Sequence, residues 1–437
     1  MTLNFFLSQN SSSFSSCFSP DFFAQTICLN IIDKSLGINY SFRTPFRIQA
    51  KDWNPSKQRP ANIYLKKSKN LNIKLNDLKI QIMRLWEERL HHHKSLSQRI
   101  LSKDIKKICC EQNNILPENS LLYFTNLYIL LKKDLISHST YKRYQVFYKL
   151  IERFEGFVMK RLEIDSTGIE FVKDFIVFGK TEEYSDNTIY RTIHFVKTIL
   201  NFAEKKGIRT QVRMMDIRRE KQHREMVTLS EEEITQIKKT SVPEKLQPAK
   251  DWLLISCYTG QRISDFMRFS DNQLKEINGK TCISFTQQKT KKKITIPLHP
   301  AVLNILNRNS GFPEAVPVTE YNLQIKKIAQ IAGLKDLIHI AKRSEHRARK
   351  MILEKWEVIS SHIGRRSFAT NFYGKIPTPL LMEATGHSTE TMFQKYVNYE
   401  NQDRILSLSW YFDKMYEECN PLTDDHLKNK QKSKPGS

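Results

Sequence analysis

The chain has 437 residues, 40% of them hydrophobic, which is enough for about two to four domains with buried cores. Its formal net charge is +24 and its pI about 9.6, a balance that favours a polyanionic partner such as nucleic acid over simple solubility. The seven cysteines are odd in number and never spaced Cys-x-x-Cys, which argues against a disulfide framework and a zinc ribbon and favours a reducing cytoplasm. No apolar run is long enough to span a membrane.

The N-terminal segment predicts a disordered leader followed by a small β-rich module. Residues 1–24 are rich in Ser and Phe and lack both the basic start and the continuous apolar stretch of a signal peptide. Apolar residues alternate weakly over 25–32 and 40–48, which predicts two short strands separated by a turn that contains Gly37. We therefore place a module at 25–68.

Residues 69–116 change to helical periodicity, with Leu and Ile recurring every three to five residues between charged side chains. This pattern predicts an exposed helix or helix pair that links two modules. The adjacent histidines His91, His92 and His93 point in different directions on a helix, so a solvated face is favoured over a metal site.

Residues 117–208 predict a helical domain with two apolar stripes, for which core packing is the favoured interpretation. The stripes consist of Tyr141, Tyr144, Phe147, Tyr148, Ile151 and Phe154, and of Ile189, Ile193, Val196, Ile199, Leu200 and Phe202. Gly207 is the expected end of the last helix. The neighbouring polar residues Lys142 and Arg143 are candidates for contact with a phosphate backbone.

A basic linker at 209–227 precedes a second domain at 228–405. The linker contains Arg209, Arg213, Arg218, Arg219, Lys221 and Arg224. Ser230 followed by three glutamates predicts the N-cap and first turn of a helix. Segments 281–286 and 293–298 predict a β-hairpin whose tip carries four lysines, namely Lys289, Lys291, Lys292 and Lys293. Residues 406–437 are expected to be a docking segment and a basic tail.

Three short clusters in this second domain carry side chains suited to phosphodiester chemistry. They read Tyr-Thr-Gly-Gln-Arg-Ile-Ser-Asp at 258–265, Ser-His-Ile-Gly-Arg-Arg-Ser-Phe-Ala-Thr at 361–370, and Gly-His-Ser-Thr-Glu-Thr-Met-Phe-Gln-Lys-Tyr at 386–396. The candidates are Arg262, His362, Arg365, His387 and Tyr396. Arginines neutralise phosphate oxygens, histidines donate hydrogen bonds or move protons, and a tyrosine can become the covalent nucleophile.

Taken alone, each cluster also has an interpretation without catalysis: a surface arginine after a turn, an exposed basic turn, or a tyrosine that packs or lies on the surface. Their joint order, with the lysine hairpin between the first and second clusters, resembles the signature of tyrosine recombinases, the phage integrase family, and in particular integrases of mobile elements. The resemblance covers 228–405 and, more loosely, 119–207 and 25–65. It implies a mainly α fold with small β-sheets: a β-rich arm-type DNA-binding module, a helical SAM-like core-binding domain and a mixed α+β catalytic domain.

The resemblance also implies residue roles. Arg262 and Arg365 clamp the scissile phosphate, His362 and His387 hydrogen-bond it and assist proton transfer, and Tyr396 attacks to give a 3′-phosphotyrosyl bond. Lys289 protonates the leaving oxygen and Asp265 supports the site, while further DNA contacts are expected at Lys142, Arg143, Arg213, Arg218, Arg219, Lys291 and Lys292. Two departures stand out: Arg366 replaces a histidine common in the family, and four lysines compete for the role given to Lys289.

The implied reaction is site-specific DNA recombination, in integration, excision or inversion. It needs no nucleotide, because the phosphotyrosine keeps the bond energy, and no metal, because no paired carboxylate cluster is evident. The expected partners are double-stranded DNA and accessory DNA-bending proteins. The chain is expected to form a homotetramer on two duplexes, and to act at the nucleoid in a bacterial cytoplasm. One alternative is an inactive DNA-binding relative, which covalent trapping of nicked DNA would distinguish from a recombinase. The other is a type IB topoisomerase-like enzyme, which would relax plasmids without strand exchange.

Overall fold

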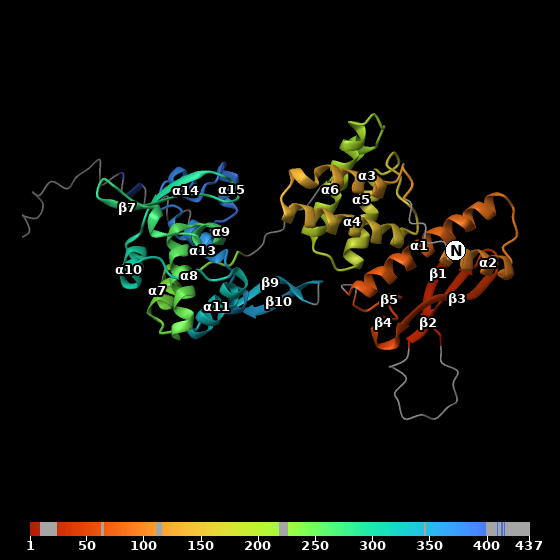
Figure 1. Cartoon of the computed structure of the whole chain (residues 1–437), viewed down its shortest axis with the longest axis horizontal. Coiled ribbons are helices and arrows are strands. Elements are labelled where there is room, and N and C mark those ends of the chain that lie inside the picture. The colour runs from red at the N-terminus through yellow and green to blue at the C-terminus, as the bar shows by residue number, and fades with distance from the viewer. Residues whose placement is uncertain are drawn as a thin grey trace, which may run out of the picture. The chain divides into compact units, whose positions relative to one another are not determined.

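The computed structural model describes residues 1–8, 24–62, 65–110, 116–217, 226–344 and 347–398, and the isolated positions 409, 412, 413 and 415. The chain forms two compact units (Figure 1): an N-terminal unit of Met1–Lys221 with the short segment Glu345–Ala348, and a C-terminal unit of Gln222–Ser344 and Arg349–Ser437. As predicted, the fold is mainly helical with small antiparallel sheets. Within the described residues, no helix is long and apolar enough to cross a membrane.

The N-terminal unit opens with a three-stranded antiparallel sheet in the order β1-β2-β3 (Figure 1). Its strands are β1 (Thr2–Leu7), β2 (Ala24–Asp33) and β3 (Ile38–Gln49), the last two matching the predicted pair. The disordered leader is wrong for residues 2–7, because β1 pairs with residues 27–32 of β2 and buries Leu3 and Phe5. Residues 9–23 lie outside the described part of the chain.

Two helices pack on this sheet, α1 (Lys66–His91) and α2 (Gln98–Cys110). The helix pair is confirmed, but the exposed linker is wrong: Leu78 and Trp86 of α1 are buried in one core with Ile27 and Leu29 of β2. An apolar stripe at helical spacing is stabilised by burial, and the sheet offers the face that it needs. A short hairpin of β4 (Trp53–Asn54) and β5 (Arg59–Pro60) follows the 3-10 turn η2 (Ala50–Asp52).

The predicted helical domain consists of α3 (Leu121–Lys132), α4 (His138–Val158), α5 (Ile169–Thr181) and α6 (Asp186–Glu204), with 3-10 turns η3 (Lys133–Leu135) and η4 (Val212–Met214). Both predicted stripes contribute to its core, with Phe154 and Ile193 among the most deeply buried residues. α1 packs against α4, and Arg161 bridges Asp77 of α1 and the buried Glu155 of α4. The β-rich part and the helical part of this unit are therefore in direct contact.

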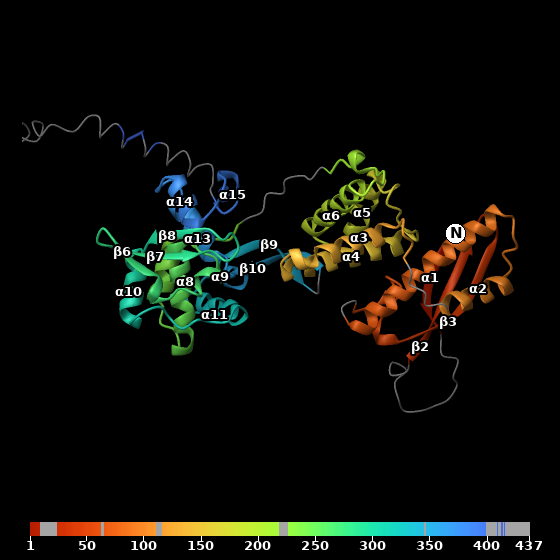
Figure 2. The ribbon, with the colours of Figure 1, turned by 45° about the horizontal axis from the view of Figure 1, so that its top comes forward.

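The C-terminal unit is built around α8 (Gln247–Thr259), which is almost entirely buried (Figure 2). Around it pack α7 (Glu231–Lys239), α10 (Pro300–Asn309), α11 (Val318–Ile331) and α13 (Ile363–Phe372). Ser230 caps α7 as predicted: its side chain accepts a hydrogen bond from the Glu233 backbone N–H, and the Glu233 carboxylate accepts one from the Ser230 backbone N–H. The smaller elements are η5 (Glu244–Leu246), α9 (Ile263–Phe266), η6 (Asp271–Gln273), α12 (Lys355–Val358), α14 (Thr378–Thr385) and α15 (Glu390–Gln394).

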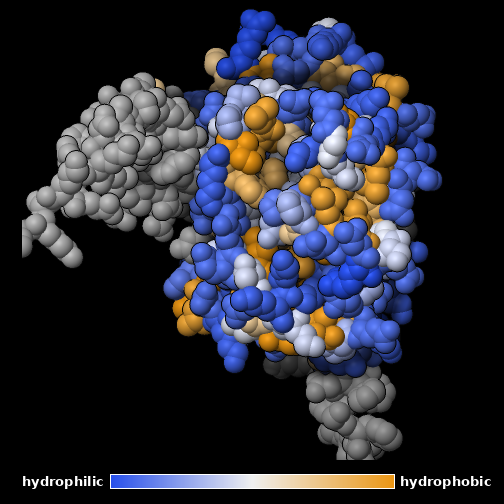
Figure 3. Space-filling view, turned by 90° about the vertical axis from the view of Figure 1, so that its left-hand side faces the viewer, coloured by the Kyte–Doolittle hydropathy of each residue, from blue (hydrophilic) through white to orange (hydrophobic). Residues whose placement is uncertain are grey.

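An antiparallel sheet in the order β6-β7-β8 carries the predicted lysine hairpin. The hairpin strands are β7 (Lys280–Thr286) and β8 (Lys293–Pro297), and β6 (Leu274–Ile277) was not predicted. A second hairpin, β9 (Leu337–Ser344) and β10 (Arg347–Glu354), was also missed. The face of this unit seen in Figure 3 is mainly hydrophilic, with small separate hydrophobic areas.

Candidate active site

Arg262 is presented by a turn that only glycine can make. α8 ends at Gly260, whose φ is +66° and whose missing Cβ would lie 2.5 Å from the ring of Phe368. A side chain at this position would be strained and would clash. The chain therefore turns sharply, and Arg262 becomes the N-cap residue of α9, with its Nη1 donating to Gln287 Oε1 at 3.3 Å.

Arg365 lies on α13 and is completely buried. Its Nη1 donates to the Gly260 carbonyl at 2.9 Å and its Nη2 to the Thr385 carbonyl at 2.7 Å, so one guanidinium joins the first and third sequence clusters. Its Nε–H has no partner within the described residues. Burial, followed by the charge of Arg262, lowers the pKa of Arg365 to about 10. A buried cation is costly unless it is hydrogen-bonded, so the unused donor and this cost point to an anionic ligand.

Two histidines flank this guanidinium. His387 Nε2 lies 3.0 Å from Arg365 Nη2, and its Nδ1 lies 2.8 Å from Thr385 Oγ1. His362 is the N-cap residue of α13. Burial, with nearby cations as the further cause, lowers the pKa of His362 to about 4 and that of His387 to about 3. Both imidazoles are therefore neutral at neutral pH.

Tyr396 follows α15 and faces the same cluster. Its ring centroid lies 4.9 Å from that of His387 and 5.9 Å from that of His362, and the guanidinium carbon of Arg365 lies 5.3 Å from it. The tyrosine is half-buried, and its backbone is held by the Phe393 carbonyl. The structure thus brings Arg262, His362, Arg365, His387 and Tyr396 into one constellation.

Asp265 and the lysine hairpin border this constellation. The Asp265 carboxylate is buried and accepts from the Gln288 amide at 2.8 Å, which fixes the start of the turn between β7 and β8. Lys289 is exposed on that turn, and its charge is among those that lower the pKa of His362. Lys292 donates to Ser388 Oγ at 3.2 Å, whereas Lys291 is exposed with a φ of +57°.

Three buried polar residues that hold the site together were not predicted: Gln261, Gln287 and Thr385. Gln287 donates to Gln261 Oε1 and to the Thr385 carbonyl, each at 3.1 Å, while its Oε1 accepts from Arg262. One sequence signal was available, because period-2 alternation along β7 places Gln287 on the same face as Ile283 and Phe285. Gly386 leaves room for it, since a Cβ there would lie 2.6 Å from Gln287 Oε1.

The structure does not test the predicted DNA contacts outside the constellation. Lys142 and Arg143 are exposed on α4, and Arg213 is exposed in η4. Arg218 and Arg219 lie outside the described residues, as does most of the predicted docking segment. These contacts stay predictions.

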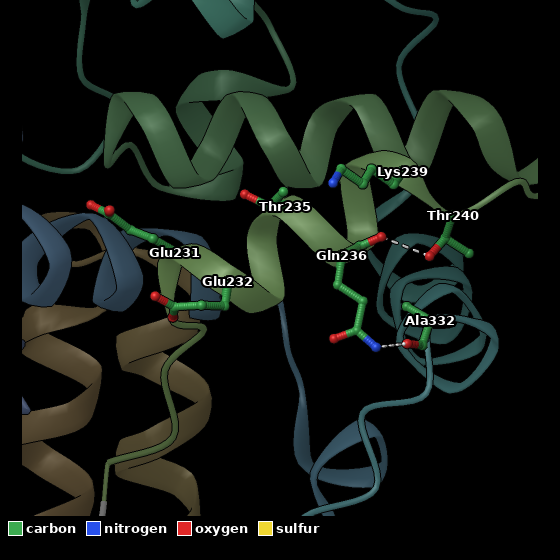
Figure 4. Close-up of a pocket in the computed structure, with 7 residues that line it drawn as sticks. All are labelled: Glu231, Glu232, Thr235, Gln236, Lys239, Thr240 and Ala332. Atoms are coloured by element: carbon green, nitrogen blue, oxygen red, sulfur yellow. Dashed lines mark hydrogen bonds between the residues drawn. The ribbon is translucent and has the colours of Figure 1, made fainter.

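A depression of about 760 Å³ lies elsewhere, along α7, and no predicted site residue lines it (Figure 4). Gln236 donates there to the Ala332 carbonyl, which ties α7 to the end of α11. Over the described part of the chain, no group of three or more His, Cys, Asp or Glu side chains is placed to hold a metal ion.

Comparison with solved structures shows a shared fold. The chain is similar to XerH site-specific recombinase bound to a palindromic difH substrate, with a TM-score of 0.51 and 14% identity over 69% of this chain and 98% of that one. It is also similar to a fragment of the Tn1549 transposon integrase in complex with circular intermediate DNA, with a TM-score of 0.50 and 16% identity over 68% and 99% of the two chains. No curated protein matches the sequence.

Family models cover more than half of the chain. The phage integrase SAM-like domain matches residues 120–213, which contain the helices α3–α6, and the phage integrase family matches residues 219–403, which contain every residue of the constellation. The chain therefore belongs to the phage integrase family, the tyrosine recombinases.

Proposed function

We propose that this chain is a site-specific DNA recombinase that cuts and rejoins DNA through a 3′-phosphotyrosyl intermediate, with Tyr396 as the nucleophile. The observation that carries the proposal is the convergence of the buried Arg365, the neutral His387 and Tyr396 in one cluster. A phosphodiester bound there would meet a cation with an unused N–H, proton-transfer groups and a phenol.

The proposed reaction is an in-line transfer. Arg262 and Arg365 bind the non-bridging oxygens and stabilise the charge that builds on them. Tyr396 Oη forms a bond to phosphorus while the bond to O5′ breaks, and the exposed Lys289 supplies the proton to O5′. A 5′-hydroxyl from another strand then reverses the step, so the bond energy is kept without a nucleotide cofactor.

A proton acceptor is required because a phenol is largely protonated at neutral pH. His362 and His387 are neutral in this range and lie beside the Tyr396 ring, so either imidazole can accept the phenol proton. An imidazolium formed here would add to the charge of two arginines, so the transfer depends on the negative charge of the bound phosphate, which offsets that charge.

Double-stranded DNA is the proposed partner. The net charge of +24 supports it, and both solved relatives named above were captured with DNA. We further propose a homotetramer on two duplexes, accessory DNA-bending proteins, and action at the bacterial nucleoid in the cytoplasm. Lys142, Arg143, Arg213, Arg218, Arg219, Lys291 and Lys292 would bind the phosphate backbone, and the residues from 25 to 68 would bind a second, arm-type site.

The test is covalent trapping on DNA that flanks the gene for this chain. Wild-type protein should form an adduct with a 3′-phosphate and release a 5′-hydroxyl, whereas Tyr396→Phe should bind the DNA without an adduct. No adduct from the wild type would indicate a DNA-binding protein without chemistry. Relaxation of arbitrary plasmids without strand exchange would indicate a topoisomerase.

A further inference from the structure

The side chain of Thr370 joins the helix that carries Arg365 to the segment that carries Tyr396. Thr370 lies near the end of α13, and its Oγ1 accepts a hydrogen bond from the Asn398 backbone N–H at 3.0 Å. The same hydroxyl donates to the Tyr396 backbone carbonyl in a longer contact of 3.4 Å. One side chain therefore binds the backbone at the proposed nucleophile and again just after it.

Before Tyr396, the segment is anchored by burial. Phe393 of α15 is completely buried in a cluster with Phe368 and Ala369 of α13. The Tyr396 N–H donates to the Phe393 carbonyl at 2.8 Å, which continues the helical turn up to the nucleophile. Each residue between Phe393 and Tyr396 keeps two soft backbone dihedrals, so this anchor alone does not fix the direction of the Tyr396 side chain.

After Tyr396, the attachments are weaker. Val397 is only partly buried against the same cluster, and Asn398 is exposed apart from the bond of its N–H to Thr370. Lys395, immediately before Tyr396, is exposed as well. A segment with few buried contacts opens at a low cost in free energy, so a single hydrogen-bonded side chain can change how often it is open.

We propose that Thr370 is a positioning residue, a clip that keeps residues 396–398 docked on α13 before DNA binds. This inference rests on the function proposed above, in which Tyr396 is the nucleophile. With the clip closed, the Tyr396 ring stays beside Arg365, whose guanidinium carbon lies 5.3 Å from the ring centroid. The nucleophile is then in place when a phosphodiester reaches the arginines, so the Thr370 hydroxyl contributes to the rate of attack and not to DNA affinity.

The clip acts from a helix that is itself held in place. Ser367 Oγ accepts from the Leu229 N–H at 2.8 Å, and Asn371 Nδ2 donates to the Leu229 carbonyl at 3.1 Å. Leu229 is completely buried in the core of the C-terminal unit. Because Arg365 lies on the same helix, Thr370 holds residues 396–398 at a defined position relative to this phosphate-binding cation.

Trypsin reports the state of the clip in the free, full-length protein, because it cuts after lysine and Lys395 directly precedes Tyr396. The rate of cutting at this bond follows the open population when opening and closing are fast. Thr370→Val keeps the branched shape but removes the hydroxyl, and it should speed cutting after Lys395 about fivefold, as expected for the loss of one net hydrogen bond. Thr370→Ser keeps the hydroxyl and should match wild type, with mass spectrometry identifying the cut bond.

Thr240→Val is the matched control. Thr240 follows the last residue of α7, is half-buried, and donates to the Gln236 carbonyl at 2.7 Å, away from the candidate active site. This variant also loses a threonine hydroxyl at the end of a helix in the same unit. It should leave the rate of cutting after Lys395 unchanged.

Covalent trapping supplies the second measurement. At saturating DNA, single-turnover adduct formation by Thr370→Val should be about fivefold slower with an unchanged Kd for DNA, and Thr370→Ser should retain the wild-type rate. Equal cutting after Lys395, or equal adduct rates, in Thr370→Val and wild type would overturn the inference. If wild type forms no adduct, the proposed function fails, whereas the trypsin measurement in the free protein still decides whether Thr370 holds the segment.

Discussion

Gln287, which is completely buried, accepts a hydrogen bond from Arg262 at 3.3 Å. The same amide donates to the Thr385 carbonyl, so it connects the lysine hairpin to the arginine turn and to the segment before His387. A buried amide with partners on both sides fixes geometry, because the loss of either partner leaves polar atoms unsatisfied.

Gln287→Leu should therefore lower both stability and cleavage. It leaves Gln261 Oε1 without its donor, and we expect about 1–3 kcal/mol of lost stability by denaturant unfolding. Cleavage should fall further than stability explains, because Arg262 loses its acceptor. The neighbouring Gln288 is exposed, so Gln288→Leu is the matched control and should leave both measurements near wild type. Equal effects from the two substitutions would contradict the positioning role.

Arg365 offers a test that separates chemistry from stability. Its charge is buried among carbonyl acceptors, so Arg365→Lys keeps the charge but cannot reach Gly260 and Thr385 together. Adduct formation should drop at least about a hundredfold in Arg365→Lys, with DNA affinity nearly unchanged because many other cations hold the backbone. Arg308→Lys, at an exposed arginine of the same unit that pairs with Asp251 outside the candidate site, provides the control. Near-normal cleavage by Arg365→Lys would rule out a bidentate clamp.

The five residues of the constellation could be proposed from the sequence because phosphoryl transfer needs particular side chains. Arginine, histidine and tyrosine in three ordered clusters indicate phosphoryl transfer whatever the details of the fold. Gln261 and Thr385 gave no such signal, since their function is to satisfy backbone carbonyls whose positions only the folded chain defines.

The fold was predictable where one periodicity dominated, as in α4 and α6. It was missed where short strands carried mixed patterns: β6 is largely exposed, and β10 contains consecutive basic residues. β1 was hidden in a Ser- and Phe-rich segment although Leu3 and Phe5 alternate. The role of α1 was misjudged because its charged residues suggested exposure, whereas its apolar stripe faces the sheet.

This correction to α1 leads to a stability prediction. Leu78 is 2% exposed in the core shared by α1 and the sheet, whereas Leu90 near the end of the same helix is 41% exposed. Leu78→Ala should cost about 2–5 kcal/mol in the unfolding of the N-terminal unit, and Leu90→Ala should cost little. Denaturation followed by tryptophan fluorescence reports the change, since Trp86 lies in the same core. If both variants lost only a little unfolding free energy, the interpretation of α1 as an exposed linker would be supported instead.

The two histidines of the candidate active site should make the protein less stable in acid. Burial lowers the pKa of His362 to about 4 and of His387 to about 3, both below the value of about 6.5 for an unfolded histidine. Between these values the unfolded chain binds more protons than the folded one, so their contribution to stability is complete above about pH 6.5 and is lost as the pH falls towards 4 and then 3. The double variant His362→Gln/His387→Gln should flatten the decline in unfolding free energy from pH 7 to pH 4, while His339→Gln, at an exposed histidine, should leave it unchanged. Unfolding by denaturant at a series of pH values measures the slope, and an equal slope in the double variant and wild type would show that other groups cause the acid sensitivity.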